Sequence, residues 1–266
     1  MRERKTRITN LINMDNVMNE SATGTESMPN LTVIPREPHE SARSWVHRLL
    51  LYNIVHMLVE PGSTLVELEL RKRLGVSRTP MREAFMQLAQ ENFITIVPQK
   101  GTYVSRIDMT EVLDLRYIRC FVEMETARRA AGRLTPEMEE ELYGCIAVQE
   151  EMAKIRDFEK FVDADDALHE IIYRAAGKEG VWDFFRRTNL QHFRSRLLRL
   201  RAGREPDALI LQHKNIVAAL VKGKPDRAAE EIQKHLSDSN WNAGSAREMF
   251  PDYITPPKTT GTPSML

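Results

Sequence analysis

Three histidines and one aspartate in the C-terminal two thirds of the chain have the types and spacing that a metal site on helices requires. They are Asp165, His169, His213 and His235. Asp165 and His169 are four residues apart, so on one helix both side chains lie on the same face. The strong breaker Gly223-Lys224-Pro225 separates His213 from His235, which predicts two helices joined by a tight turn. Each of these histidines is eleven residues from Lys224, so antiparallel packing would place both about 16 Å from the turn. We therefore expect the four side chains to converge.

Such a cluster would hold a divalent metal ion. Imidazole with one carboxylate suits Zn, Ni, Fe, Mn or Co, and ligand type alone does not choose among them. A lone helical histidine is more often a packing or surface residue than a ligand, so the hypothesis depends on the four side chains together. His192, nearby in the sequence, is interpreted as supporting the ligands or the fold.

The same cluster leaves two other interpretations open. Three imidazoles and an aspartate can activate water, so a metal-dependent hydrolase or isomerase, fused to an N-terminal module over residues 41–106, is one alternative. Asp166 is adjacent, but no further Glu or His is placed as an obvious general base. In the other alternative the metal is purely structural, or is itself a signal to which the protein responds.

The elements that must position these residues are predicted to be helices. An all-helical domain is expected over residues 107–243, and its helices are separated by breaks near Gly132, residues 156–157, residues 177–178, Gly203 and Lys224. These breaks predict six helices. The segments on either side, an arm over 1–40 and a tail over 244–266, are polar and proline-containing and are expected to be unfolded.

Composition limits the class of protein. The chain has 266 residues, of which 42% are apolar and 29% charged, which is enough for two globular domains. Two cysteines give no disulfide framework, so a reducing, cytoplasmic location is expected. We expect no secretory or membrane-spanning segment, because no apolar run approaches eighteen residues.

Residues 41–106 have the pattern of a winged helix-turn-helix, which binds double-stranded DNA. Helices are expected over 41–58, 68–74 and 78–91, followed by a hairpin that turns at Pro98-Gln99-Lys100-Gly101. The net charge of the whole chain is zero, but from Arg43 to Arg106 nine Lys and Arg face five Glu. The basic surplus thus lies where the DNA-binding motif is.

The third helix of this module is the predicted recognition helix. Ser77 is placed to cap it, and Pro80 lies in its first turn, where a missing N–H costs little. Arg78 and Arg82 are four residues apart on one face, suited to guanine edges or phosphates. Two solvated arginines on an ordinary amphipathic helix would show the same spacing, and the turn and hairpin around them favour the DNA-binding interpretation.

The segment Leu74-Gly-Val-Ser-Arg-Thr-Pro-Met-Arg-Glu-Ala84, with Pro61-Gly62 before it and the hairpin turn after it, resembles the GntR family of bacterial transcription regulators. This resemblance implies contacts to DNA from Arg78, Thr79 and Arg82 on the recognition helix and from the wing. The full predicted set is Arg71, Ser77, Arg78, Thr79, Arg82, Lys100 and Gly101. Two positions depart from the family. Leu68 stands where some members carry a DNA-contacting arginine, for which Arg71 is the nearby replacement. Asn92 stands where the family has glycine, and asparagine tolerates the left-handed conformation needed there.

The helical part resembles the effector (FCD) domain of the FadR-type branch, and six helices point to its shorter, VanR-like variant. In metal-binding members, the residues at the positions of Asp165, His169, His213 and His235 hold a divalent ion. A small carboxylate ligand completes the coordination of that ion. Arg119, Arg194 and Arg196 are the candidate effector-binding residues, although Arg119 with Glu123 could equally be a helix-surface ion pair. The resemblance implies a homodimeric repressor or activator that binds a pseudo-palindromic operator.

Overall fold

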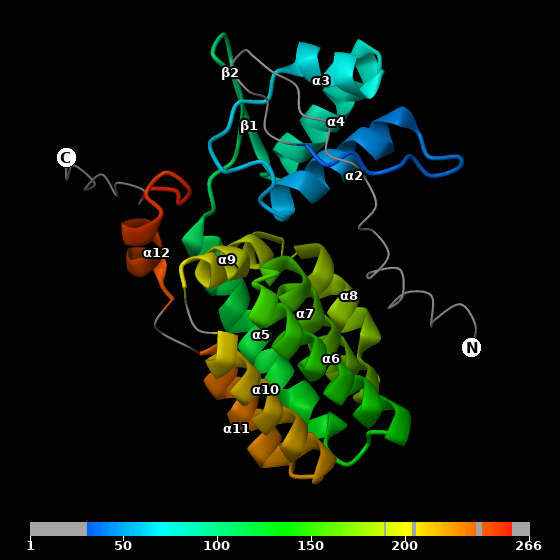
Figure 1. Ribbon diagram of the computed structural model, residues 1–266, viewed down its shortest axis with the longest axis vertical. Coiled ribbons are helices and arrows are strands. Elements are labelled where there is room, and N and C mark those ends of the chain that lie inside the picture. The colour runs from blue at the N-terminus through cyan, green and yellow to red at the C-terminus, as the bar shows by residue number, and fades with distance from the viewer. Residues whose placement is uncertain (1–30, 189, 204–205, 238–240, 257–266) are drawn as a thin grey trace, which may run out of the picture.

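The structure is a computed structural model that describes residues 31–188, 190–203, 206–237 and 241–256. It has a small N-terminal module above a larger helical bundle (Figure 1). In chain order the elements are α2 (Ala42–Val55), α3 (Glu67–Leu74), α4 (Arg78–Gln90), β1 (Ile94–Val97), β2 (Gly101–Val104), α5 (Met109–Ala130), α6 (Pro136–Ile155), α7 (Phe158–Ala175), α8 (Glu179–Thr188), α9 (Leu190–Arg201), α10 (Pro206–Val221), α11 (Pro225–Leu236) and α12 (Ala243–Met249).

The N-terminal module is the predicted winged helix-turn-helix. Strands β1 and β2 form an antiparallel hairpin in which Ile94 pairs with Val104 and Val97 with Gly101. In α4, the buried Met81, Phe85 and Leu88 recur at helical spacing and face the core of the module. Asn92, just after α4, has φ of 62°, the left-handed conformation expected for it.

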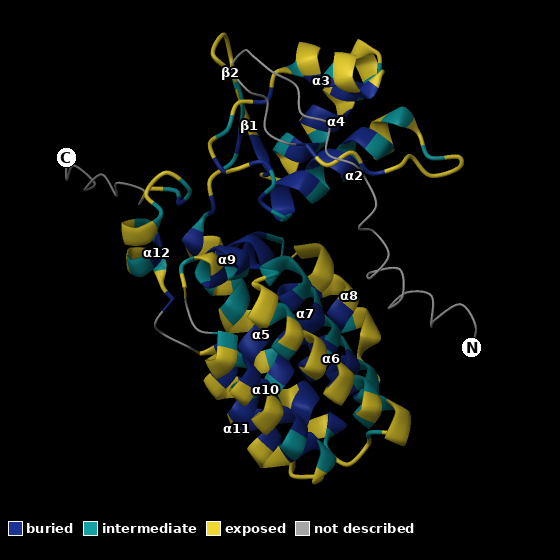
Figure 2. Cartoon of the chain, viewed as in Figure 1, coloured by how far each residue is buried: buried dark blue, intermediate teal, exposed yellow. Residues whose placement is uncertain are grey.

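The bundle is built from antiparallel helix pairs whose apolar faces meet in its interior. Helix α5 packs on α11, α6 packs on α7, and α10 packs on both α11 and α6. Figure 2 shows that most buried positions lie on the facing sides of these helices and that the outward faces are exposed. None of the described helices is both long and apolar enough to cross a membrane.

The bundle contains one more helix than predicted. Among the described residues from 109 to 236, seven helices are present rather than six, because α8 ends at Thr188 and α9 begins at Leu190. No Gly or Pro marks this boundary. The two helices separate because they have different packing partners: Trp182 and Phe185 of α8 pack against Tyr173, whereas α9 is buried between α5, α7 and α2. The VanR-like assignment rested on the six-helix count and is not kept.

Two described segments, 31–40 and 244–256, are folded where the sequence predicted parts of an unfolded arm and tail. Residues 31–40, expected in the unfolded arm, lie along α2 with Leu31 and Ile34 buried. Asn53 fixes this segment, because its side chain bonds both the N–H (2.7 Å) and the carbonyl (2.9 Å) of Thr32. Residues 243–249, placed at the start of the tail, form α12, and Ile254 is buried beyond it. The remaining parts of the expected arm and tail, 1–30 and 257–266, lie outside the described residues.

Candidate metal centre and nucleic-acid interface

The four predicted ligands converge inside the bundle. Asp165 and His169 extend from α7, His213 from α10 and His235 from α11. One ligand atom from each lies within 4.8 Å of the others, and all four residues are buried. The convergence predicted from helix spacing is therefore confirmed. It arises because α10 and α11 pack antiparallel about the turn at residues 223–225, beside the paired helices α6 and α7.

The Nε2 atoms of the histidines face the centre of the cluster. His169 Nε2 lies 3.1 Å from Asp165 Oδ1, and His213 Nε2 lies 3.7 Å from the same oxygen. His213 Nε2 and His235 Nε2 are 3.3 Å apart. Asp165 Oδ1 and His169 Nε2 are buried and have no hydrogen-bond partner among the described residues. Buried polar atoms without partners are costly, and a cation between them would satisfy several at once.

The Nδ1 atoms point outward, each to an oxygen. His213 Nδ1 is 2.7 Å from Gln149 Oε1, His235 Nδ1 is 2.9 Å from Gln212 Oε1, and His169 Nδ1 contacts Glu123 Oε1. Because an amide oxygen accepts, Nδ1 of His213 and Nδ1 of His235 carry the proton, which leaves each Nε2 lone pair directed inward. This support of an imidazole by a second hydrogen bond is typical of metal-binding histidines.

The charges of the site favour the metal-binding protonation states of Asp165, His213 and His235. Burial lowers the pKa of His213 to about 4 and holds the pKa of His235 well below its usual range, so both imidazoles are neutral. Burial opposes ionisation of Asp165, but Arg196 Nη2, 3.1 Å away, and the neighbouring histidines keep its pKa well below normal. Glu123 raises the pKa of His169 against the effect of burial, so a metal ion would have to displace a proton from this imidazole. With that proton released, the donor set fits a divalent ion.

Removing the support of a single imidazole should weaken metal binding without removing a ligand. We expect Gln149→Leu to reduce Zn²⁺ affinity about 10- to 100-fold, because His213 loses the acceptor that fixes its tautomer and ring orientation. Isothermal titration of metal-free protein measures this. Gln191→Leu is the matched control, because Gln191 is a buried glutamine that bonds Arg194 instead of a histidine. Equal Zn²⁺ affinities in the two variants would contradict the role given to Gln149.

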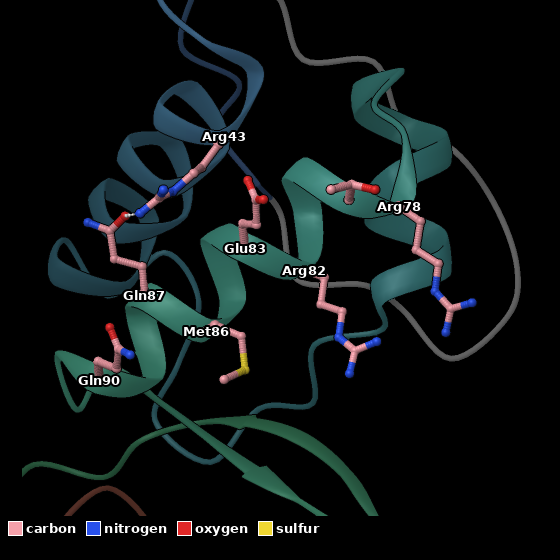
Figure 3. A pocket seen from close by; sticks show the side chains of 8 residues that line it. Arg43, Arg78, Arg82, Glu83, Met86, Gln87 and Gln90 are labelled. Carbon is pink, nitrogen blue, oxygen red and sulfur yellow. Dashed lines mark hydrogen bonds between the residues drawn. The ribbon is translucent and has the colours of Figure 1, made fainter.

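The predicted recognition helix presents its polar face to solvent. Arg78, Thr79 and Arg82 are exposed and line a surface hollow of about 650 Å³. Arg78 and Arg82 extend to the same side of α4, whereas Arg43 is turned to Gln87, with which it forms a 3.1 Å hydrogen bond (Figure 3).

The remaining predicted DNA contacts lie at the helix start, in α3 and in the wing. Ser77 occupies the N-cap position of α4, as predicted. Its side chain makes no capping hydrogen bond to the first turn of the helix. That leaves its hydroxyl free for another acceptor. Arg71 is half-buried in α3, the helix before α4, and Lys100 is exposed in the hairpin turn. Gly101 has φ of 139°, where a side chain would be strained and would meet the Tyr103 hydroxyl at 3.4 Å. The backbone conformation at the hairpin tip therefore favours glycine.

Comparison with known proteins identifies the class of the chain. Residues 44–104 match the family of bacterial regulatory proteins called gntR, and residues 114–238 match the FCD domain. The HTH-type transcriptional repressor RspR of Escherichia coli K12 is 30% identical over 218 residues, which cover 82% of this chain and 96% of that relative. The chain belongs to the GntR family and carries an FCD domain.

Other GntR relatives agree. A regulator from Streptomyces ambofaciens is 32% identical over 183 residues, 69% of this chain and 77% of that protein. The fold matches the solved structure of E. coli McbR, with a TM-score of 0.61 at 18% identity, covering 80% of this chain and 99% of that one. A GntR regulator from Rhodococcus sp. RHA1 gives a TM-score of 0.60 at 19% identity, covering 79% and 98%.

This GntR chain is accordingly a DNA-binding transcription regulator. Its relatives are named as regulators and repressors, not as enzymes. The alternative of a metal-dependent hydrolase or isomerase is therefore set aside.

A small cavity of about 50 Å³ lies directly beside the cluster in the FCD domain. Asp165 and His235 form part of its wall, so the cluster and the cavity are continuous. Four arginines also line it: Arg116, Arg119, Arg196 and Arg199. Of the three predicted effector-binding residues, Arg119 and Arg196 are thus brought to the cavity.

Arg194 is placed elsewhere, because two residues along a helix turn a side chain about 200° from Arg196. Its guanidinium donates to Ser105 O at 2.9 Å and to Gln191 Oε1 at 3.0 Å. It therefore holds the linker between the two domains rather than lining the cavity.

Arg119 does pair with Glu123, but not on the helix surface. The Nε–Oε2 distance is 2.9 Å, both side chains are buried, and Arg119 Nη2 has no hydrogen-bond partner among the described residues. Through Glu123 the pair also contacts His169, so it belongs to the site.

Sequence reasoning did not identify Gln149, Gln212 or Trp241 as site residues. Gln149 and Gln212 support histidines, and Trp241 lines the cavity from the segment that follows α11. An amide side chain carries no local signal of such a role, because the role depends on which helix packs beside it.

Proposed function

We propose that this protein is a homodimeric repressor that binds a pseudo-palindromic operator in the cytoplasm and responds to a small organic acid at a metal centre. Asp165, His169, His213 and His235 would hold the divalent ion. The observation that carries the proposal is the continuity of this buried cluster with an arginine-lined cavity. When bound, the ion would supply the positive charge that attracts carboxylate oxygens.

The chemistry of the cavity favours a small anion. Arg119 has an unpartnered Nη2, and Arg196 reaches the cavity from beside Asp165 and Asp166, with Nη1 2.6 Å from Asp166 Oδ1. Guanidinium groups bind carboxylates through paired hydrogen bonds, which are stronger where water is excluded. A volume of about 50 Å³ excludes a fatty-acyl chain and limits the ligand to a few heavy atoms unless the walls move.

A dimer is supported by the exposed face of α5. Tyr117, Ile118 and Phe121 are 66%, 49% and 58% exposed, and the rings of Tyr117 and Phe121 contact each other with centroids 4.8 Å apart. Adjacent exposed aromatic and aliphatic side chains mark interaction surfaces.

Dimeric helix-turn-helix proteins place two recognition helices in successive major grooves, which leads to pseudo-palindromic operators. Within each half-site, Arg71, Ser77, Arg78, Thr79, Arg82, Lys100 and Gly101 would contact DNA.

Repression by such a dimer requires that the acid discriminate between two states. A ligand shifts the equilibrium only by the ratio of its affinities for the DNA-binding and the non-binding arrangement. The relative RspR is named a repressor, which supports repression rather than activation of transcription for this protein.

Native mass spectrometry of protein purified without chelator tests the proposal directly. We expect the mass of two chains with one divalent ion and one small acid per chain, and loss of both additions in Asp165→Ala. DNA affinity is then measured with and without the acid so identified. An ion without any acid, together with DNA affinity that follows metal content, would instead support a structural or signalling metal.

A further inference from the structure

One described segment after the bundle helices runs from the cavity to the DNA-binding module. It comprises residues 241–256, which we call the C-terminal strap, and includes α12. In Figure 1, α12 lies to the side of the junction between the two domains, near α9. From residue 244 onward, the strap lies where the sequence predicts an unfolded tail.

The first residue of the strap forms a wall of the cavity. Trp241 is 3% exposed and lines the cavity together with Asp165 and Arg196. Its indole N–H donates to Ser195 Oγ at 2.8 Å, and its carbonyl accepts from Arg116 Nη1 at 3.2 Å. Both partners also line the cavity, so a ligand there must meet Trp241 or the groups that hold it.

The middle of the strap is held as a rigid helix. Asn242 caps α12 by accepting from the N–H groups of Gly244 and Ser245, and Ser245 returns a bond to the Asn242 N–H. Ala246 is fully buried, and α12 packs against α5. A capped helix with a buried face moves as a unit rather than bending between its ends.

The far end of the strap is bonded to the linker between the domains. Ile254 is 1% exposed and forms a parallel bridge with Ile107, which lies between β2 and α5. The Ile107 N–H donates to Tyr253 O at 2.8 Å, and the Thr255 N–H donates to Ile107 O at 2.9 Å.

The same end touches the DNA-binding module itself. Burial and the neighbouring Glu60 carboxylate raise the pKa of the Tyr253 hydroxyl, which places Tyr253 beside Glu60. A Cβ placed on Gly62 would lie 3.8 Å from Asp252 O. The Gly62 N–H in turn donates to Val104 O, at the end of the wing strand β2. The strap therefore contacts the structure that positions the wing.

We infer that the C-terminal strap carries the state of the cavity to the DNA-binding module, with Trp241 as the sensing residue and the Ile107–Ile254 bridge as the output. Closely packed elements shift between discrete arrangements rather than deforming gradually, so a displacement of Trp241 is delivered through α12 to the linker. The inference rests on the proposed function only in that an effector occupies the cavity. The mechanical connection between the two ends is testable without any ligand.

Hydrogen exchange of the full-length protein tests this connection from the cavity end. Trp241→Phe keeps an aromatic side chain, although a smaller one, and removes the N–H that donates to Ser195. We expect it to speed exchange of the distant Ile107 and Thr255 amides roughly five- to ten-fold. Trp182→Phe is a matched control, because Trp182 is also 3% exposed and donates to Glu170 Oε2 at 3.3 Å but lies in α8. Equal rates at Ile107 in the two variants would overturn the inference.

The reverse experiment starts at the linker end. The chain has three tryptophans, so Trp45→Phe with Trp182→Phe leaves Trp241 as the single fluorophore. In this background, Ile254→Ala should raise the acrylamide quenching constant of Trp241 about two-fold, because the far anchor is loosened. Ile34→Ala, a comparably buried isoleucine away from the strap, should not change it. A quenching constant unaltered by Ile254→Ala would also refute the connection.

Zn²⁺ separates failure of the inference from failure of the proposed function. Added metal should slow amide exchange in α7, α10 and α11 of wild-type protein and also at Ile107, and the second effect should disappear in Trp241→Phe. Slower exchange confined to the ligand helices of wild-type protein would refute the strap as a route while leaving the metal centre intact. If Zn²⁺ changed exchange nowhere, the metal proposal would fail, and the two ligand-free experiments would still decide on the strap.

Discussion

Replacing His213 with alanine should weaken Zn²⁺ binding by about a hundred-fold or more, because it removes a proposed metal ligand itself. Gln149→Leu, by contrast, removes only the hydrogen-bond acceptor that orients this ligand. His213 is central to the cluster, since its Nε2 lies 3.3 Å from His235 Nε2 and 3.7 Å from Asp165 Oδ1. Two neutral imidazole nitrogens at that distance offer lone pairs to each other unless a proton or a metal lies between them. Titration calorimetry of metal-free protein gives the affinities directly.

The stability of the protein should report the same change. A metal that binds the folded state alone stabilises it by about 2.7 kcal/mol at a free concentration of 100 times its Kd. We expect Zn²⁺ to raise the melting temperature of the wild-type chain and to leave that of His213→Ala almost unchanged. His192→Ala is the matched control, because His192 is buried beside the cavity but outside the cluster. If His213→Ala and wild type showed the same Zn²⁺-induced increase, His213 would not be a ligand.

The site itself was predictable because helix geometry relates sequence spacing to position. Four residues along a helix place Asp165 and His169 on one face, and equal distances from a glycine-proline turn place His213 and His235 at one level. Neither argument needs knowledge of the other helices. The role of Gln149 could not be predicted in this way. It lies on α6 and its partner His213 on α10, and only tertiary packing brings these two helices together.

The boundary between α8 and α9 was not predictable for a related reason. Helix ends are read from Gly, Pro and capping residues, and the segment from Trp182 to Phe193 contains no Gly or Pro. The chain changes helix there because Phe185 and Phe193 are buried against different neighbours, on α7 and near α2.

The two ends of the described chain illustrate how few apolar residues can fix a segment. Residues 31–40 are mostly polar, yet Leu31 and Ile34 are buried and Asn53 satisfies both backbone groups of Thr32. The prediction of disorder relied on the mean composition of the segment, which does not reveal single apolar residues that become buried. The same holds for Trp241 and Ile254, which fix the C-terminal strap at both ends.

Replacing Arg82 with alanine should weaken binding to a DNA site selected by the wild-type protein about 10- to 100-fold, the range expected when one bidentate base contact is lost. Arg82 is exposed on α4 and extends to the same side as Arg78 (Figure 3). Fluorescence anisotropy with labelled DNA measures the affinity. Arg187→Ala, an exposed arginine at the end of α8, is the control for loss of one positive charge.

Arg82→Lys distinguishes the two ways in which Arg82 could act on DNA. If Arg82 binds a guanine edge, lysine keeps the charge but loses the planar fork, so the preference for guanine at one position of the operator should relax. If it binds phosphate, lysine should restore most of the affinity, and only Arg82→Ala should reduce the dependence of binding on salt concentration, by about one unit of slope. Affinity of Arg82→Ala equal to that of Arg187→Ala at all salt concentrations would exclude this face of α4 as the DNA-reading surface, because a recognition helix cannot lose its central cation without consequence.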